Sequence, residues 1–268
     1  MCATCGCDDA GAVTITGPGQ DHHEHDHHDH HDHDHHAHAH AHAHETVVLE
    51  QDVLAKNGLL AERNRGWLEA RGVCAVNLMS SPGSGKTTLL ERTVRELAAD
   101  LALAVIEGDQ ETPMDAERLR ATGCRTLQIN TGSGCHLDAD MLARALRTLD
   151  PADRTLVFIE NVGNLVCPAL FDLGEQHRIV LASTTEGEDK PLKYPHMFRG
   201  ADLVLLTKVD LLPHLRFDTE RFAEHLSRVN PRAGVLPVSA VTGEGLDRWH
   251  GWLRAALPPR VPGVPAGH

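Results

Sequence analysis

The sequence predicts an α/β domain with a mostly parallel sheet and helices on both faces, preceded by an N-terminal arm rich in metal ligands. Seven short segments are apolar along nearly their whole length, and segments with helical patterns separate them. Strands of that kind are typical of parallel sheets that are covered on both faces. A glycine-rich loop follows the first of these segments and precedes a helix, and the N-terminus is dense in histidine and cysteine.

The expected strands are residues 73–79, 101–107, 125–129, 155–160, 178–183, 202–207 and 234–239. Ligands of such sheets bind beyond the carboxyl ends of the strands, so the site is expected in the loops that follow them. We divide the chain into the arm at residues 1–44, a helical connector at 45–71, a nucleotide-binding domain at 72–258 and a tail at 259–268. The connector is expected to be an amphipathic helix or helix pair, interrupted near Asn57-Gly58.

The arm contains fourteen histidines: His22, His23, His25, His27, His28, His30, His31, His33, His35, His36, His38, His40, His42 and His44. Imidazole nitrogen suits Zn, Cu, Fe and Ni. With so few apolar side chains the arm should be disordered without metal. We interpret the histidines as a store of exchangeable, unselective sites, because their irregular interleaving with Asp and Ala is unlike an artificial tag.

Three cysteines, Cys2, Cys5 and Cys7, lie within six residues at the start of the chain. Three sulfur atoms and the neighbouring α-amino group make four ligands in a short loop, which is compatible with square-planar Ni(II). The alternative is a redox CxxC, but no strand precedes it and no helix of the thioredoxin type follows. We therefore predict a compact metal site here.

Charge and cysteine usage limit the class of protein. The formal net charge is -13, and no Lys or Arg precedes Lys56. This acidic excess argues against nucleic acid as a partner and suits cations. Seven cysteines, three of them in the first seven positions, favour reduced thiols over a disulfide framework. Without a signal peptide or a run of ~20 apolar residues, we expect a soluble cytoplasmic protein with no membrane partner.

The glycine-rich loop, Ser80 to Thr88, reads SSPGSGKTT. It fits the P-loop pattern GxxxxGK[ST], with Ser80 in place of the first glycine. Backbone N–H groups of such a loop face phosphate oxygens, the lysine reaches the β- and γ-phosphates, and the threonine hydroxyl binds Mg²⁺. The alternative is a turn with a solvent-exposed lysine, which the flanking strand and helix disfavour. The expected nucleotide-binding residues are Gly83, Ser84, Gly85, Lys86, Thr87 and Thr88.

The segment Thr207 to Asp210, TKVD, resembles the guanine-specificity motif NKxD of GTPases, with Thr in place of Asn. On that resemblance the Asp210 carboxylate accepts two hydrogen bonds from guanine, and Lys208 packs on the base. The segment VSA at residues 238–240 resembles the loop that donates a backbone N–H to guanine O6. We therefore add Ser239 and Ala240 to the predicted GTP site.

Two acidic residues, Asp109 and Glu160, end or follow predicted strands and are candidates to complete the Mg²⁺ shell, so that with Lys86 and Thr87 they form the predicted catalytic group. Their alternatives are a helix N-cap for Asp109 and a loop hydrogen bond for Glu160. No glutamine other than Gln110 is a candidate to position the attacking water. We expect slow intrinsic hydrolysis.

A second metal site is predicted from Cys135, His136 and Cys167. The first two follow the third strand and are expected to open a helix, and Cys167 follows the fourth strand. Because parallel strands end at one edge of the sheet, these residues could meet one another or their copies in a second subunit. Two thiolates and an imidazole suit Zn or Ni. The alternative makes Cys135 a helix cap and Cys167 a small buried side chain, as we expect for Cys74 and Cys124.

These segments together resemble the HypB family of hydrogenase nickel-incorporation GTPases. The resemblance extends over MCATCGC, the His-rich insert, SSPGSGKTT, EGDQETPMDAERLRATG, GCHLDADM, ENVGNLVCP, EGEDKPLKYP and TKVD. It implies a P-loop GTPase fold of the SIMIBI class that forms a homodimer with nucleotide at the interface. It also implies GTP-dependent nickel delivery to the [NiFe]-hydrogenase large subunit together with a HypA-type accessory protein.

The resemblance assigns a tight nickel site to Cys2, Cys5 and Cys7, and a metal site in the GTPase domain to Cys135, His136 and Cys167. A urease-type nickel GTPase is the alternative within the class, but its metal motif is Cys-Pro-His. Here His136 follows Cys135 directly, and Pro168 follows Cys167 without a histidine. An alternative from another class is a nickel buffer or storage protein in which the nucleotide domain is secondary.

Overall fold

The computed structural model describes residues 36–109, 114–132 and 134–258, with side chains from Asp52 onward. The chain divides into two compact units, residues 1–55 and 56–268, and the sheet lies in the second. The predicted ligands Cys2, Cys5 and Cys7 and the histidines from His22 to His35 lie outside the described residues, as does Gln110. For the histidines from His36 to His44 the structure describes the backbone alone.

Helix α1 (His36–Ala70) differs from the prediction at two points. It begins inside the segment that we expected to be disordered, where alternating Ala supplies the strongest helix former. It also continues through Asn57-Gly58 without the expected break. The Asn57 side chain donates to the Asp172 carbonyl at 2.8 Å and accepts from the Ala139 N–H at 2.9 Å. Because its amide is engaged outside the helix, it does not compete with the local backbone.

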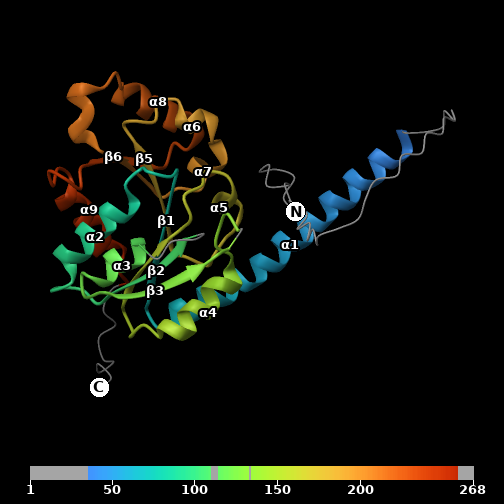
Figure 1. Ribbon diagram of the computed structural model, residues 1–268, viewed down its shortest axis with the longest axis horizontal. Coiled ribbons are helices and arrows are strands. Elements are labelled where there is room, and N and C mark those ends of the chain that lie inside the picture. The colour runs from blue at the N-terminus through green and yellow to red at the C-terminus, as the bar shows by residue number, and fades with distance from the viewer. Residues whose placement is uncertain (1–35, 110–113, 133, 259–268) are drawn as a thin grey trace, which may run out of the picture. The chain divides into compact units, whose positions relative to one another are not determined.

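The sheet contains seven strands, and every neighbouring pair is parallel (Figure 1). They are β1 (Cys74–Ser80), β2 (Leu103–Asp109), β3 (Arg125–Asn130), β4 (Leu156–Glu160), β5 (His177–Ser183), β6 (Leu203–Thr207) and β7 (Gly234–Val238). Their spatial order is β3-β2-β4-β1-β5-β6-β7. All seven predicted strands are present, and the predicted fold class is confirmed.

Helices cover both faces of the sheet. They are α2 (Lys86–Leu97), α3 (Met114–Arg120), α4 (Ala139–Leu149), α5 (Cys167–Leu170), α6 (Lys190–Lys193), α7 (Pro195–Arg199), α8 (Thr219–Val229) and α9 (Leu246–Ala256), with a 3-10 helix η1 (Val209–His214). Helices α2, α3 and α9 pack against one face around Leu90 and Trp249. On the other face, α4 and the end of α1 pack over β1, β2 and β4, and α7 and α8 pack over β5 and β6.

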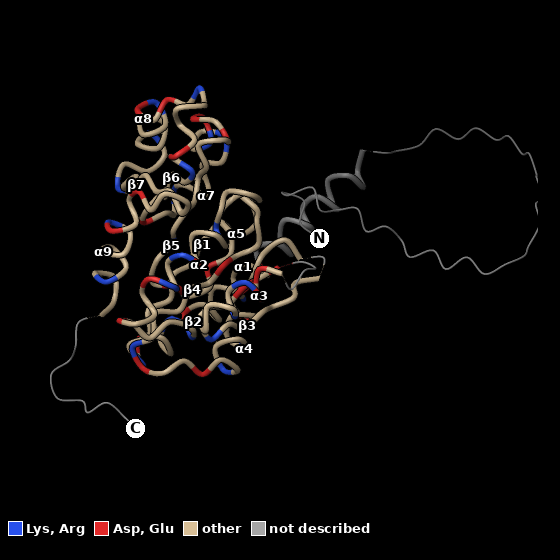
Figure 2. The backbone as a smooth tube through the Cα atoms, turned by 60° about the vertical axis from the view of Figure 1, so that its left-hand side comes forward, with Lys and Arg blue, Asp and Glu red and all other residues tan. Residues whose placement is uncertain are grey.

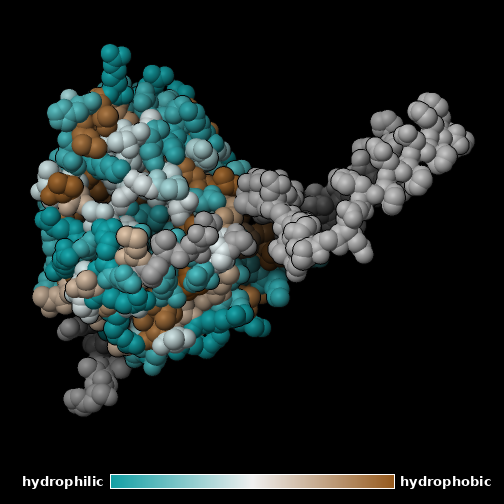
Figure 3. Space-filling model, in the orientation of Figure 1, coloured by the Kyte–Doolittle hydropathy of each residue, from teal (hydrophilic) through white to brown (hydrophobic). Residues whose placement is uncertain are grey.

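The surface of the described part is mostly hydrophilic, with small scattered apolar areas in the view of Figure 3. Acidic and basic residues are both scattered over the described backbone (Figure 2). Among the described residues, no helix has the length and apolar character needed to cross a bilayer. The largest buried side chains, Trp249 and three phenylalanines among them, lie between the sheet and its helices.

Candidate functional site: a nucleotide pocket beside a metal centre

The loop between β1 and α2 has the backbone of a phosphate-binding loop. Gly83 (φ 72°) and Gly85 (φ 94°) occupy the left-handed region that favours glycine. Lys86 is 9% exposed, and its Nζ donates to the Ser80 hydroxyl at 2.9 Å. Ser80, which replaces the first glycine of the pattern, thus holds the lysine. Burial lowers the pKa of Lys86, and the nearby Glu160 carboxylate opposes that shift. A buried ammonium of this kind is suited to an anionic ligand.

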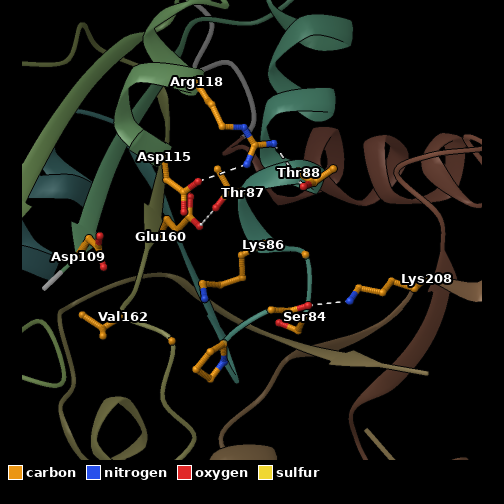
Figure 4. Close-up of a pocket in the computed structure, with 14 residues that line it drawn as sticks. Ser84, Lys86, Thr87, Thr88, Asp109, Asp115, Arg118, Glu160, Val162 and Lys208 are labelled. Carbon is orange, nitrogen blue, oxygen red and sulfur yellow. Dashed lines mark hydrogen bonds and ion pairs between the residues drawn. The ribbon is translucent and has the colours of Figure 1, made fainter. Parts of the chain in front are cut away.

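A pocket of about 530 Å³ opens above this loop (Figure 4). Its lining contains Pro82, Gly83, Ser84, Gly85, Lys86, Thr87, Thr88, Asp109, Asp115, Arg118, Glu160, Val162, Gly163 and Lys208. Nine of the residues predicted for the nucleotide site are in this lining. The structure therefore gathers the P-loop, both predicted acids and the lysine of TKVD around one cavity.

Glu160 faces the pocket from the end of β4. The Thr87 hydroxyl donates to Glu160 Oε1 at 2.6 Å. The carboxyl is 4% exposed, and its Oε2 has no hydrogen-bond partner among the described residues. Burial raises the pKa of Glu160, while Lys86 and Thr87 lower it. A hydroxyl beside an unsatisfied buried carboxyl oxygen is a donor set that Mg²⁺ prefers. The residues present therefore fit a magnesium ion, which Thr87 and Glu160 would hold.

Glu107 was not predicted as a site residue. It is in register with Glu160 on neighbouring strands and is 2% exposed. Burial and then the Glu160 carboxylate raise the pKa of Glu107 to about 8. In the sequence Glu107 ends an apolar run that was expected to form a buried strand. A charged residue in such a strand was the signal that could have identified it as a site residue. A second buried acid therefore adjoins the predicted magnesium position.

Arg118 and Asp115, on α3, also line the pocket and were not predicted. The Arg118 guanidinium donates to the Thr88 hydroxyl at 3.3 Å, to Glu91 at 2.8 Å and to Asp115 at 3.2 Å. Asp115 and Arg118 are three positions apart, so they share one face of the helix. Asp115 lies in the first turn of the helix after β2, at the carboxyl edge of the sheet, and this position could have suggested it. Both bring charge to the rim of the phosphate loop.

The TKVD segment is tied to the phosphate loop by two hydrogen bonds. The Thr207 hydroxyl donates to the Ser84 carbonyl, and Lys208 Nζ donates to the Gly83 carbonyl, both at 2.7 Å. Thr207, where the motif usually has Asn, therefore makes a contact to the P-loop backbone. Lys208 itself has a positive φ of 59°. This geometry keeps the predicted base-binding residues beside the predicted phosphate-binding residues.

Asp210 and the loop after β7 also meet. The Ser239 hydroxyl donates to Asp210 Oδ1 at 2.6 Å. The same hydroxyl accepts from the N–H groups of Val241 and Thr242, and Ala240 lies between them and Ser239. The structure thus brings together Asp210, Ser239 and Ala240, which the sequence assigned to guanine recognition. Asp210 is not in the lining of the phosphate pocket.

The predicted second metal site is assembled within one chain. The ligand atoms of Cys135, His136 and Cys167 all lie within 4.8 Å of one another, and no other cluster of three such residues occurs in the part of the chain that the structure describes. The two Sγ atoms are 2.7 Å apart, which exceeds the ~2.05 Å of a disulfide bond. Cys135 Sγ lies 3.7 Å from His136 Nδ1. This arrangement can hold a thiophilic divalent ion with a position left for a further ligand.

His136 is positioned by stacking. Its ring lies 3.8 Å from the ring of Phe171, centroid to centroid, at an interplanar angle of 25°. Burial lowers the pKa of His136, and Asp138 opposes the shift. Burial therefore favours the neutral imidazole, which is the form that binds a metal.

The helix predicted to open at Cys135-His136 begins later. Helix α4 starts at Ala139, and its N-cap is Asp138, whose carboxylate accepts from the Met141 N–H at 2.7 Å. Aspartate is a far better N-cap than cysteine or histidine, so the two ligands lie in the preceding loop. Cys167 is fully buried and is the first residue of α5.

The remaining described cysteines lie apart from this cluster. Cys74 is buried in β1, and its thiol donates to the Ala256 carbonyl at 3.6 Å. Cys124 is half-buried before β3, and burial raises the pKa of its thiol to about 11. The burial that disfavours the Cys124 thiolate and the buried strand position of Cys74 suit both residues to packing.

A parallel sheet with a phosphate-binding loop at its carboxyl edge defines a P-loop nucleotide-binding protein. The chain belongs to the CobW/HypB/UreG family, whose nucleotide-binding domain matches residues 74–237. The resemblance to HypB is confirmed by its relatives. Hydrogenase maturation factor HypB of Rhizobium leguminosarum bv. viciae is 55% identical over 215 residues, covering 80% of this chain and 72% of the relative. The factor of the same name from Escherichia coli (strain K12) is 58% identical over 205 residues, covering 76% and 71%.

Two solved structures are similar to this one over about three quarters of the chain. HypB from Archaeoglobus fulgidus is 42% identical with a TM-score of 0.71, covering 76% of this chain and 100% of that one. HypB from Helicobacter pylori, solved in complex with nickel, is 36% identical with a TM-score of 0.70, covering 77% and 99%. Nucleotide binding at the P-loop and a role in hydrogenase maturation are therefore features of the proteins to which this chain is homologous.

Proposed function

We propose that this chain is a GTP-hydrolysing nickel metallochaperone that stores nickel and delivers it for assembly of the [NiFe]-hydrogenase active site. One observation carries the proposal. The segment of residues 161–167 lines the nucleotide pocket through Val162 and Gly163 and ends at the metal-site residue Cys167. A segment that touches both sites allows the nucleotide to change the metal affinity, and by linkage the metal to change the nucleotide affinity.

Hydrolysis would use the residues around the P-loop. Lys86 would bind the β- and γ-phosphates, and Thr87, Glu160 and Asp109 would hold Mg²⁺ directly or through water. The bound ion would neutralise charge that develops on the phosphate oxygens. Lys86 is already desolvated and so interacts strongly with an incoming phosphate. Because the described lining of the pocket contains no glutamine that could position water, we propose a slow intrinsic rate.

Guanine selectivity would come from Asp210. Its carboxylate can accept hydrogen bonds from the N1–H and the 2-amino group of guanine, whereas adenine has no matching pair of donors. Lys208 would cover the base with its aliphatic stem, and the N–H of Ala240 is available for guanine O6. The Ser239 hydroxyl, 2.6 Å from Asp210 Oδ1, holds the carboxylate toward this loop.

The cargo would be Ni²⁺, with Zn²⁺ as the competing ion. The HypB structure from Helicobacter pylori contains nickel, which supports this choice. In the proposed division of labour, Cys2, Cys5 and Cys7 hold one ion tightly, the arm histidines store others, and Cys135, His136 and Cys167 take part in transfer. The partners would be a second copy of the chain, a HypA-type accessory protein and the hydrogenase large subunit, in the cytoplasm.

The test is the nickel content of hydrogenase purified from cells that express Lys86→Ala at limiting nickel. We expect the large subunit to lack nickel, because the P-loop can no longer bind the terminal phosphates. Lys193→Ala is the matched control, since Lys193 is largely exposed and pairs with Asp189 at 2.7 Å. Fully nickel-loaded hydrogenase in the Lys86→Ala strain would overturn the delivery proposal.

Urease is a second candidate client. A relative from Helicobacter hepaticus, 46% identical over 210 residues, is named a hydrogenase/urease maturation factor HypB. Deleting this chain's gene and measuring the nickel content of both enzymes would separate the two clients. Deleting residues 8–44 tests storage: if hydrogenase is then fully matured at low nickel, storage is auxiliary to delivery.

A further inference from the structure

One short segment links the two sites. It follows Glu160, the acid that accepts from Thr87, and ends at Cys167. Its Gly163 packs so tightly on the P-loop that a Cβ there would lie 3.1 Å from Pro82 Cα. A change in the phosphate loop or at Glu160 therefore bears directly on this segment. The contact between Gly163 and Pro82 connects the P-loop to Cys167, which is only one of the three predicted metal ligands.

The side chain of Asn161 reaches the other two. Asn161 is 1% exposed, and its Oδ1 accepts from the Leu137 N–H at 3.2 Å and from the Val162 N–H at 3.0 Å. Leu137 directly follows Cys135 and His136 in the chain. One buried carbonyl oxygen thus joins the segment that leaves the nucleotide pocket to the loop that carries the remaining ligands.

The orientation of this amide is fixed from its other end. Asn161 Nδ2 donates to Asn77 Oδ1 at 3.3 Å, and Asn77 Nδ2 donates to Glu175 Oε1 at 3.2 Å. Asn77 lies in the central strand β1 and is fully buried. A buried amide whose two ends are both engaged cannot rotate without leaving polar groups unsatisfied. Movement of Asn161 is therefore expected to move the Leu137 N–H with it.

A second clamp holds the metal loops without touching the nucleotide pocket. Asn64, on α1, donates to the Ala139 carbonyl at 2.8 Å and to the Leu173 carbonyl at 2.9 Å. It bridges the end of the Cys135-His136 loop to the chain that follows α5. Asn64 is buried, with 5% of its surface exposed, so it is a matched comparison for Asn161.

We propose that Asn161 is the positioning residue that makes the geometry of the Cys135–His136–Cys167 site depend on the bound nucleotide, through its hydrogen bond to the Leu137 N–H. This inference rests on the proposed nucleotide-dependent metal binding. Glu160 is the residue at which the magnesium-nucleotide complex is sensed, and Asn161 is the next residue along the chain. Asn64 sets the overall stability of the metal loops and is the same in both nucleotide states.

The test measures nickel dissociation constants by competition with a chromophoric chelator, in magnesium with GDP or with a non-hydrolysable GTP analogue. All proteins are full-length and carry Cys2, Cys5 and Cys7→Ser to remove the arm's tight site. In this reference protein the two constants should differ by about fivefold or more. In Asn161→Ala the ratio should fall to within about twofold of one.

Two further variants separate coupling from folding. Asn161→Asp, as a buried neutral carboxyl, keeps an oxygen for the Leu137 N–H and a donor for Asn77 Oδ1, and should retain the reference ratio. Asn64→Ala should shift both constants in the same direction and leave the ratio unchanged. If Asn161→Ala does not fold, Asn161→Ser takes its place, because its hydroxyl is too short to reach Leu137. An unchanged ratio in the Ala or Ser variant overturns this inference alone. A ratio of one in the reference protein overturns the proposed nucleotide dependence as well.

Discussion

The Sγ atoms of Cys135 and Cys167 lie 2.7 Å apart, although 32 positions separate the two residues in the chain. The parallel sheet brings them together. Strands β3 and β4 both flank β2, so the loops that follow them share the carboxyl edge of the sheet. The P-loop opens at the same edge, after β1. The candidate metal site and the nucleotide pocket therefore lie at the same edge of the sheet as a consequence of strand order.

Replacing Cys167 by serine should abolish nickel binding at this site. A hydroxyl is a poor ligand for a metal that prefers thiolate, and loss of one of three ligands should weaken binding by more than about 100-fold. Nickel titration of protein that carries Cys2, Cys5 and Cys7→Ser measures this loss of affinity. Cys124→Ser, at a thiol outside the cluster, should bind like the parent. Equal affinity in the Cys167 and Cys124 variants would remove Cys167 from the site.

Glu160→Gln should slow GTP hydrolysis by at least about tenfold and raise the magnesium concentration that hydrolysis requires. The amide keeps the size of the side chain but removes the negative charge beside Thr87. Steady-state phosphate release at varied magnesium measures both effects, with the exposed Glu220→Gln as the control. Wild-type magnesium dependence in Glu160→Gln would place the ion elsewhere.

Asp210→Asn should weaken GTP binding by about 100-fold or more, because two hydrogen bonds to a charged acceptor are lost. The amide still offers an oxygen to Ser239, so the loop after β7 should be retained. An amide donor matches the 2-carbonyl of xanthine, and xanthosine triphosphate should therefore bind the variant better than GTP does. Unchanged GTP affinity, measured by calorimetry, would mean that Asp210 does not read the base.

The pH dependence of stability should show a contribution from His177 at the start of β5. Its Nδ1 lies 3.8 Å from the Asp202 carboxylate, and the interactions with Asp202 and then Cys74 raise the pKa of His177 to about 9. The folded state thus holds this proton more tightly than the unfolded chain, whose histidine pKa is about 6.5. The stabilisation is full below pH 6.5 and is lost as the pH rises through 9.

The unfolding free energy of His177→Gln should accordingly approach that of the wild type as the pH rises. Because the pair is partly exposed, we expect the difference in unfolding free energy to be about 1 kcal/mol at pH 6 and close to zero above pH 9. Urea denaturation at a series of pH values measures it, with the exposed His196→Gln as control. A difference that stays constant across this range would contradict the pairing.

The strands could be predicted from sequence because a buried parallel strand has a local signature, an apolar run between helical segments. The P-loop residues could also be predicted, because their motif is one short continuous segment. The continuity of α1 could not be predicted from the local sequence, because the amide of Asn57 is satisfied by Asp172 and Ala139, which lie 115 and 82 positions away. The predicted start of α4 at Cys135-His136 was wrong because Asp138 caps the helix, which begins at Ala139.

The charged residues that were missed depend on tertiary structure. Arg118 and Asp115 reach the pocket because α3 packs beside α2, and Glu107 faces Glu160 through strand register. Neither relationship is encoded in a short motif. The same holds for Asn161, whose partners Leu137 and Asn77 come from different parts of the chain.

Nucleotide control of the metal site can be measured by following the nickel–thiolate absorption of nickel-loaded protein after rapid mixing with magnesium and GTP. The protein carries Cys2, Cys5 and Cys7→Ser, so that the absorption reports on Cys135 and Cys167. We predict a change that magnesium with GTP produces, that magnesium with ADP does not, and that Lys86→Ala abolishes. Absorption that stays constant through GTP binding and hydrolysis would contradict the claim that the nucleotide controls the metal site.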